Sequence, residues 1–170
     1  MDDSGPVSVE GLAVVNTDGW YETPDSTRIT YTYADGVVLN CRQVPGTNSK
    51  QLGTEFVGAK GSLFVYRGGL IANPPELLRS GEVPPIVNSE ANAAHVKDFI
   101  DCIKSRRKPA ADINIGHRSA TVCHLGNIAV RTGKKISWDP KTETVVGDAE
   151  AAKWLTKEYR KPYSLVLKAA

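Results

Sequence analysis

The chain has 170 residues, which is enough for one domain with a real hydrophobic core. Hydrophobic residues make up 41% of it and charged residues 24%, which is ordinary for a globular protein and excludes an intrinsically disordered one. The net charge of +2 provides no strong field for attracting nucleic acid or an anionic membrane. We therefore expect neither a nucleic-acid partner nor a membrane partner.

The cysteines are few and widely spaced. Cys41, Cys102 and Cys123 form no Cys-x-x-Cys pair, so free thiols are expected in place of a disulfide framework or a zinc site. No stretch approaches the roughly 20 apolar residues of a membrane span. Residues 1–6 are acidic and polar, which is the opposite of a secretory signal peptide, so the sequence predicts no targeting signal.

The first part of the chain has the period of β-strands. Residues 7–15 are β-rich, and residues 27–33 alternate so that Ile29, Tyr31 and Tyr33 face one way. This alternation predicts a half-buried strand. A one-sided tyrosine face either packs under helices or against another subunit, or it binds sugars.

Two hairpins are predicted next. The Asp-Gly pair at 35–36 is a strong turn signal, and residues 37–41 form the return strand. Residues 55–57 and 63–66 predict the second hairpin. Residues 67–85 are rich in Gly and Pro and are predicted to be mostly loop.

The character of the sequence changes at Asn88. Apolar residues recur at helical spacing over 93–103, which predicts an amphipathic helix packed on a core. Asn88 or Ser89 is the expected cap. Basic residues at 104–108 suit the C-terminus of this helix, and Pro109 stops it.

A second helix is predicted from about residue 116 to 132, ended by Gly133. A short strand over 135–138 follows, and Asp148 is expected to cap a short helix that runs to Tyr159 and buries Trp154. Strands first and helices afterwards predict an α+β fold. We expect a largely antiparallel open sheet with helices packed on one face, as a single domain over residues 1–170.

Catalytic and cofactor motifs are not found. The sequence contains no GxGxxG and no GxxxxGK[ST], and the Gly-rich residues 67–69 lack the spacing and the following helix that would hold a phosphate. No nucleophile elbow supports Ser-His-Asp chemistry. His117 and His124 lie seven positions apart and would share a helix face, but metal-binding helices usually place ligands three or four apart. We predict no catalytic, cofactor-binding or metal residues.

The cluster Gly116-His117-Arg118-Ser119 at the expected helix start has two interpretations. The free N–H groups of a helix start, together with His117 and Arg118, could hold an anion or sugar hydroxyls. Alternatively the cluster is structural, with Gly116 making the turn, Ser119 capping the helix, and the other two side chains bonding nearby carbonyl groups.

Four features follow one another over residues 90–165: the first helix, the Lys-Pro break at 108–109, the Gly-His-Arg-Ser at 116–119 and the Trp-Asp-Pro at 138–140. In their order they resemble the C-terminal region of bacterial oxidoreductases of the Gfo/Idh/MocA family, which includes glucose–fructose oxidoreductase, inositol dehydrogenase and rhizopine catabolism proteins. The Tyr-Ala-Asp-Gly hairpin at 33–36 and the Phe-Val-Gly-Ala-Lys-Gly-Ser-Leu stretch at 56–63 are similar to the family's sheet strands.

The resemblance implies a role for this chain. Such proteins have an N-terminal Rossmann domain followed by an α+β domain that lines the substrate cleft and builds the oligomer through its sheet face. The full enzymes pass hydride between NAD or NADP and a sugar, inositol or related hydroxyl. We therefore expect a sugar-like small molecule bound by His117, Arg118 and Tyr66, and self-association into a dimer or tetramer.

The departures from the family are equally informative. Its cofactor fingerprint, its Glu-Lys-Pro lysine and its Gly-x-His-x-x-Asp motif lie upstream of the position that corresponds to Met1. The chain is thus expected to be a truncated oxidoreductase that lacks the Rossmann domain, binds no cofactor alone and is inactive alone. The alternative is a non-enzymatic carbohydrate- or protein-binding module that uses the open sheet face. Localisation stays open, with cytoplasm as the default and an exported, periplasmic parent as the other option.

Overall fold

The computed structural model describes residues 5–43, 45–46, 52–66, 69–78 and 91–164. They fall into two compact units, and each is described by itself: a first unit of residues 1–44 with 113–170, and a second unit of residues 45–112. That the chain forms a single domain stays a prediction. None of the helices in the described ranges is both long and apolar enough to cross a membrane.

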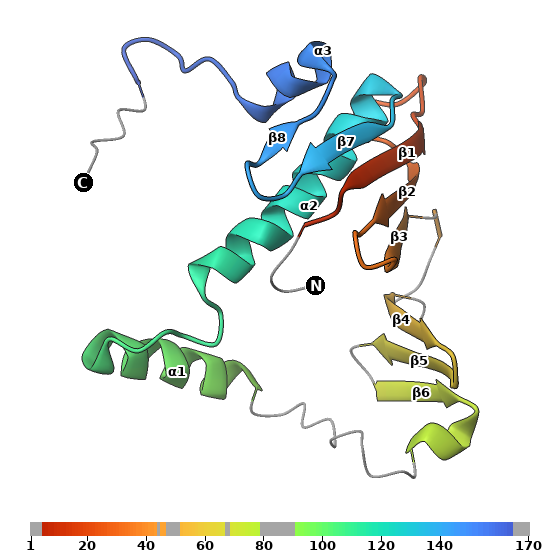
Figure 1. The fold of residues 1–170 in the computed structure, drawn as a ribbon, viewed down its shortest axis with the longest axis vertical. Coiled ribbons are helices and arrows are strands. Elements are labelled where there is room, and N and C mark those ends of the chain that lie inside the picture. Colours follow the sequence, from red (N-terminus) through yellow and green to blue (C-terminus); the bar gives the residue numbers. More distant parts are fainter. Residues whose placement is uncertain (1–4, 44, 47–51, 67–68, 79–90, 165–170) are drawn as a thin grey trace. The chain divides into compact units, whose positions relative to one another are not determined.

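The first unit contains an antiparallel sheet of five strands in the order β3-β2-β1-β7-β8, shown in Figure 1. Strand β1 lies in the middle because it pairs with β2 on one side and with β7, from the far end of the chain, on the other. The bounds of the strands are Ser8–Val14 for β1, Ser26–Thr32 for β2, Val38–Gln43 for β3, Ile136–Asp139 for β7 and Thr144–Val145 for β8.

The predicted alternation in β2 is confirmed. Ile29, Tyr31 and Tyr33 are 8%, 3% and 5% exposed and belong to the core, so this tyrosine face packs under a helix. Burial raises the pKa of the Tyr31 hydroxyl well above its usual value. The predicted hairpin turn is also present: Gly36 has a φ of 89°, and the Asp35 carboxylate accepts a hydrogen bond from the Val37 N–H.

Helix α2 (Ile113–Thr132) covers one face of this sheet and begins three residues earlier than predicted. Gly133, with a φ of 63°, ends it as expected. The apolar side of α2 buries Leu125 and Ala129 against the sheet residues Val9 and Ile136. The expected α+β class with a largely antiparallel open sheet is therefore confirmed, with α2 on one face of the five-stranded sheet, although the strands divide between two sheets.

Beyond β8, Asp148 caps helix α3 (Ala149–Ala152) as predicted, because its carboxylate accepts the N–H groups of Glu150 and Ala151. A short 3-10 helix, η2 (Lys153–Leu155), follows. The expected continuation to Tyr159 is wrong, since Thr156 is already extended. The predicted burial of Trp154 is wrong as well, because this residue is 52% exposed.

The second unit contains an antiparallel sheet in the order β4-β5-β6, followed by the 3-10 helix η1 (Pro75–Leu78). The strands are Gly53–Gly58, Gly61–Tyr66 and Gly69–Asn73. The β4-β5 hairpin was predicted. The predicted loop over 67–85 is wrong at β6. The short apolar run of this strand pairs with β5, and the strand ends before Pro74. Residues 79–85 lie outside the described ranges.

Helix α1 (Ala91–Ser105) also belongs to the second unit. Its expected caps at residues 88–89 lie outside the described residues. Arg106 has a φ of 59° and ends the helix within the basic run, three residues before Pro109. The expected packing on a core is not observed, since Phe99 is 58% exposed and Val96 59%.

Hydrogen bonds connect helix α1 to the residues that follow its C-terminal end. The Asp98 carboxylate accepts hydrogen bonds from the Ala110 N–H at 2.8 Å and from Arg107 Nη2 at 2.6 Å. These bonds, the one from Ala110 first, lower the pKa of Asp98. The basic run thus contributes to holding the helix end, which agrees with its interpretation as helix-end chemistry. Beside it Cys102 is buried, and Cys41, Cys102 and Cys123 are all free thiols, as expected.

Candidate functional site

A groove runs along one side of helix α2 in the first unit. Five of its side chains recur at helical spacing, His117, Thr121, His124, Ile128 and Arg131. The facing wall comes from Trp138 in β7, Glu143 in the turn before β8, and residues 154–157. We call this cavity the α2 groove. Its volume of about 540 Å³ lies within the range of roughly 300–1,000 Å³ that is usual for small-molecule sites.

One wall of the α2 groove is aromatic. The guanidinium carbon of Arg131 lies 5.7 Å from the centroid of the Trp154 ring, within cation–π distance. Arg131 comes from the last turn of α2 and Trp154 from η2, so this contact joins the two sides of the groove. Asp148 caps α3, the helix that directly precedes η2 in the chain. Lys134 pairs with Asp148 at 2.8 Å and is the main cause of the lowered pKa of that carboxyl.

A polar pair stands near the other end of the groove. His117 Nε2 lies 2.7 Å from Glu143 Oε1, which connects α2 to the β7-β8 turn. Asp139 fixes that turn: its carboxylate accepts the Lys141 N–H at 2.9 Å and the Thr142 hydroxyl at 2.8 Å. These bonds, the Lys141 one first, lower the pKa of Asp139. Glu143 itself has a φ of 53°, an uncommon conformation for a residue other than glycine, and it is held where its carboxylate meets the imidazole.

A smaller pocket adjoins the groove at this pair. Its volume is about 170 Å³, and we call it the Arg118 pocket. It shares four lining residues with the groove, namely His117, Thr121, Trp138 and Glu143. Arg118, Asn114, Val122, Pro140, Gly5 and Pro6 complete the lining. The Nε atom of Arg118 is buried and has no hydrogen-bond partner among the described residues.

Two of the three predicted substrate residues meet here. His117 and Arg118 are neighbours in the Arg118 pocket. Tyr66 lies in strand β5 of the second unit, where its ring stacks on Phe64 at 5.7 Å, and it does not line either cavity. Ser119 is no helix cap, since its hydroxyl donates to the carbonyl of Ile115 within α2.

Sequence reasoning missed the wall that faces α2. Trp138, Glu143 and Trp154 follow α2 in the chain, and no local pattern marks them as site residues. The seven-residue spacing of His117 and His124 was the available signal, because both residues were expected to share one face and both line the groove. The described residues contain no group of three or more side chains that could hold a metal ion.

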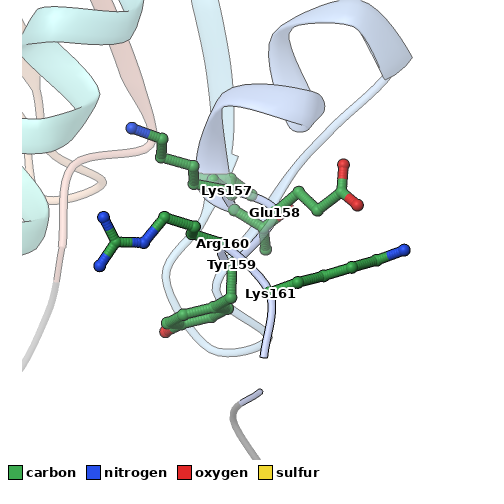
Figure 2. A pocket seen from close by; sticks show the side chains of 7 residues that line it. Lys157, Glu158, Tyr159, Arg160 and Lys161 are labelled. Atoms are coloured by element: carbon green, nitrogen blue, oxygen red, sulfur yellow. The ribbon is translucent and has the colours of Figure 1, made fainter. Parts of the chain in front are cut away.

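The segment after η2 encloses a further hollow, of about 1040 Å³, lined by residues 155–161. Figure 2 shows that Lys157 and Arg160 point to one side of this segment, and Glu158 and Lys161 to the other. All of its lining residues are exposed and consecutive in the chain. Among the described residues no second element lines this hollow, so the α2 groove and the Arg118 pocket remain the candidate site.

Several solved structures share the fold. The WlbA dehydrogenase from Bordetella pertussis, in complex with NADH and UDP-GlcNAcA, is 15% identical with a TM-score of 0.57, over 79% of this chain and 39% of that one. The aldose-aldose oxidoreductase from Caulobacter crescentus, complexed with glycerol, is 16% identical with a TM-score of 0.51, over 79% and 42%. UDP-N-acetylglucosamine 3-dehydrogenase GnnA from Acidithiobacillus ferrooxidans is 18% identical with a TM-score of 0.50, over 76% and 42%.

At these identities the likeness is one of fold, and this chain spans less than half the length of each neighbour. None of the curated proteins matches it. Residues 1–165 match the family described as "Oxidoreductase family, C-terminal alpha/beta domain" of the Gfo/Idh/MocA group. Because that match covers nearly the whole sequence, the chain belongs to the Gfo/Idh/MocA oxidoreductase family and corresponds to its C-terminal α/β domain.

Proposed function

We propose that this chain lines the sugar- or polyol-binding side of the substrate cleft in an NAD(P)-dependent oxidoreductase of this family. The observation that carries the proposal is the α2 groove, which combines an aromatic wall with hydrogen-bonding side chains in a cavity of ligand size. Support also comes from two neighbours of the same fold, which were crystallised with UDP-GlcNAcA and with glycerol.

In this proposal the chain positions substrate and performs no hydride transfer. The exposed face of Trp154 packs against the C–H face of a sugar ring, while His117, Thr121 and Asn127 bond its hydroxyl groups. His117 is held by Glu143, so its imidazole is oriented before the ligand arrives. We assign these side chains to binding and orientation.

The described residues do not fit a dinucleotide. Such a site needs a Gly-rich turn between a strand and a helix, with the pyrophosphate at the helix N-terminus. Gly69 instead opens strand β6, and all strand pairs among the described residues are antiparallel. In the proposal, NAD or NADP is therefore bound by residues other than those described. Those residues also supply the proton-transfer groups.

The proposal includes self-association through a sheet face. One face of the β4-β5-β6 sheet carries exposed apolar side chains, since the register places Val57 at 79% exposed and Ile71 at 56% exposed on the same side. Exposed apolar surface of this kind is typical of protein–protein interfaces. We propose that it pairs with a second copy, the two-fold contact being the commonest arrangement for identical chains.

Saturation-transfer NMR on the intact chain tests the groove, with myo-inositol and UDP-N-acetylglucosamine as probes. We expect saturation of the C–H protons of at least one probe. Trp154→Ala should weaken its binding about two- to tenfold, the usual contribution of an aromatic contact. Trp20→Ala is the matched control, because Trp20 belongs to the same unit, is 97% exposed and does not line the groove. Equal losses in both variants, or no transfer to either probe, would contradict the proposed groove.

A further inference from the structure

We propose that the Arg118 pocket binds an anionic group, a carboxylate or a phosphate, of the molecule that occupies the α2 groove. The inference rests on the proposed function for the ring of that molecule, and it adds the chemical class of one substituent. Its basis is the guanidinium of Arg118, the shape of the pocket and the balance of charges around it.

The first observation is the unpartnered nitrogen. Nε of Arg118 is shielded from water, and no atom of the described residues accepts its hydrogen. A buried donor without an acceptor is costly, so such groups are rare in folded proteins. The guanidinium to which this nitrogen belongs lines the Arg118 pocket, and the structure supplies no acceptor for its Nε–H. The planar guanidinium suits carboxylate and phosphate oxygens in particular, because it offers two parallel donors.

The second observation is the balance of charges in the lining. Arg118 is permanently charged, and Glu143 is the single carboxylate among the residues that line the pocket or the groove. Glu143 pairs with His117 at 2.7 Å, and among the described residues no ion pair joins Glu143 to Arg118. Arg131 and Lys157 add two further cations to the groove. The combined site is therefore positive and favours a negatively charged ligand.

The third observation is continuity. The pocket and the groove share His117 and Glu143, which places the pocket at the end of the groove and not at a separate location. A volume of about 170 Å³ beside one of about 540 Å³ fits a small substituent next to a larger body. A sugar acid or a sugar phosphate has this form, with its ring in the groove and its charged group against Arg118.

Calorimetric titration of the intact chain with three probes tests the inference: D-glucose, D-glucuronate and glucose 6-phosphate. We expect at least one of the two anions to bind about tenfold or more tightly than glucose, as charge-assisted hydrogen bonds do. The anion that shows this preference identifies whether the group is a carboxylate or a phosphate. Equal affinity for all three probes would overturn the inference.

Three variants test whether the preference for an anion depends on Arg118. Arg118→Gln should remove the preference for the anion and leave binding of glucose unchanged. Arg118→Lys, which keeps the charge without the planar fork, should retain part of it and also covers the case in which the glutamine variant fails to fold. Arg28→Gln is the matched control, because it removes one charge from an exposed position on β2 in the same unit. A preference that survives Arg118→Gln, or falls equally in Arg28→Gln, would overturn the inference.

The two proposals fail separately. Binding of glucose that depends on Trp154, with no preference for either anion, rejects the anion site and supports the groove. Binding of an anion that depends on Arg118, with no saturation transfer to a neutral ring, supports the anion site and rejects the groove as the sugar site. Absence of both kinds of binding rejects both proposals.

Discussion

Leu125→Ala is expected to lower the free energy of unfolding of the first unit by about 2–5 kcal/mol. The Leu125 side chain is 1% exposed and belongs to the core between α2 and the sheet, together with Val9 and Ile136, which are both fully buried. Removing three carbon atoms at this place loses their transfer from water and leaves a cavity that rigid strands cannot fill. Urea denaturation followed by far-UV circular dichroism measures the change.

Leu12→Ala is the matched control for this variant. Leu12 lies on β1, the strand that α2 covers, but its side chain is 74% exposed. The same chemical deletion there should change stability by no more than about 0.5 kcal/mol, the usual range for surface substitutions. Equal losses in the two variants would show that α2 does not cover the sheet in the way described above.

Gly126→Ala is expected to destabilise the first unit by about 1–3 kcal/mol, although alanine favours helix more than glycine does. A Cβ at Gly126 would lie 2.2 Å from the Tyr31 hydroxyl oxygen and 3.1 Å from Ile29 Cδ1. Tyr31 is 3% exposed, so its ring has little room to move away. The glycine therefore permits the close approach of α2 to β2.

Gly116→Ala, on the same helix, should have the opposite sign. A Cβ at Gly116 meets no atom within 4 Å, so the gain in helix propensity, up to about 1 kcal/mol, is not offset by overlap. Thermal unfolding of both variants beside the parent chain measures the two effects. A stabilising Gly126→Ala would contradict the close packing of α2 on β2.

The sequence predicts those parts of the fold in which a local pattern decides the structure. The alternation through Ile29 and Tyr31 is set by burial of one strand face, and Asp148 caps α3 through bonds to residues two and three positions away. Both effects act over a few residues, so they can be predicted from a single sequence. The same holds for His117 and His124, whose shared helix face follows from their spacing.

Features that depend on distant residues could not be predicted in this way. Strand β6 forms because β5 offers it a pairing edge, which outweighs the Gly- and Pro-rich composition of its flanks. The wall of the α2 groove depends on tertiary packing, since Trp138 and Trp154 reach α2 only when β7 and η2 are in place. The unpartnered nitrogen of Arg118 is likewise a property of the packed state, because in the sequence Arg118 looks like any other cation.

The most direct test of the central claim, that this chain is the substrate-side domain of its family, is a calorimetric titration of the intact purified chain with NAD⁺ and NADP⁺. We predict no binding of either cofactor, because the described strands are antiparallel and the described residues form no Gly-rich turn before a helix. Micromolar binding of NAD⁺ or NADP⁺ by this chain alone would contradict the account.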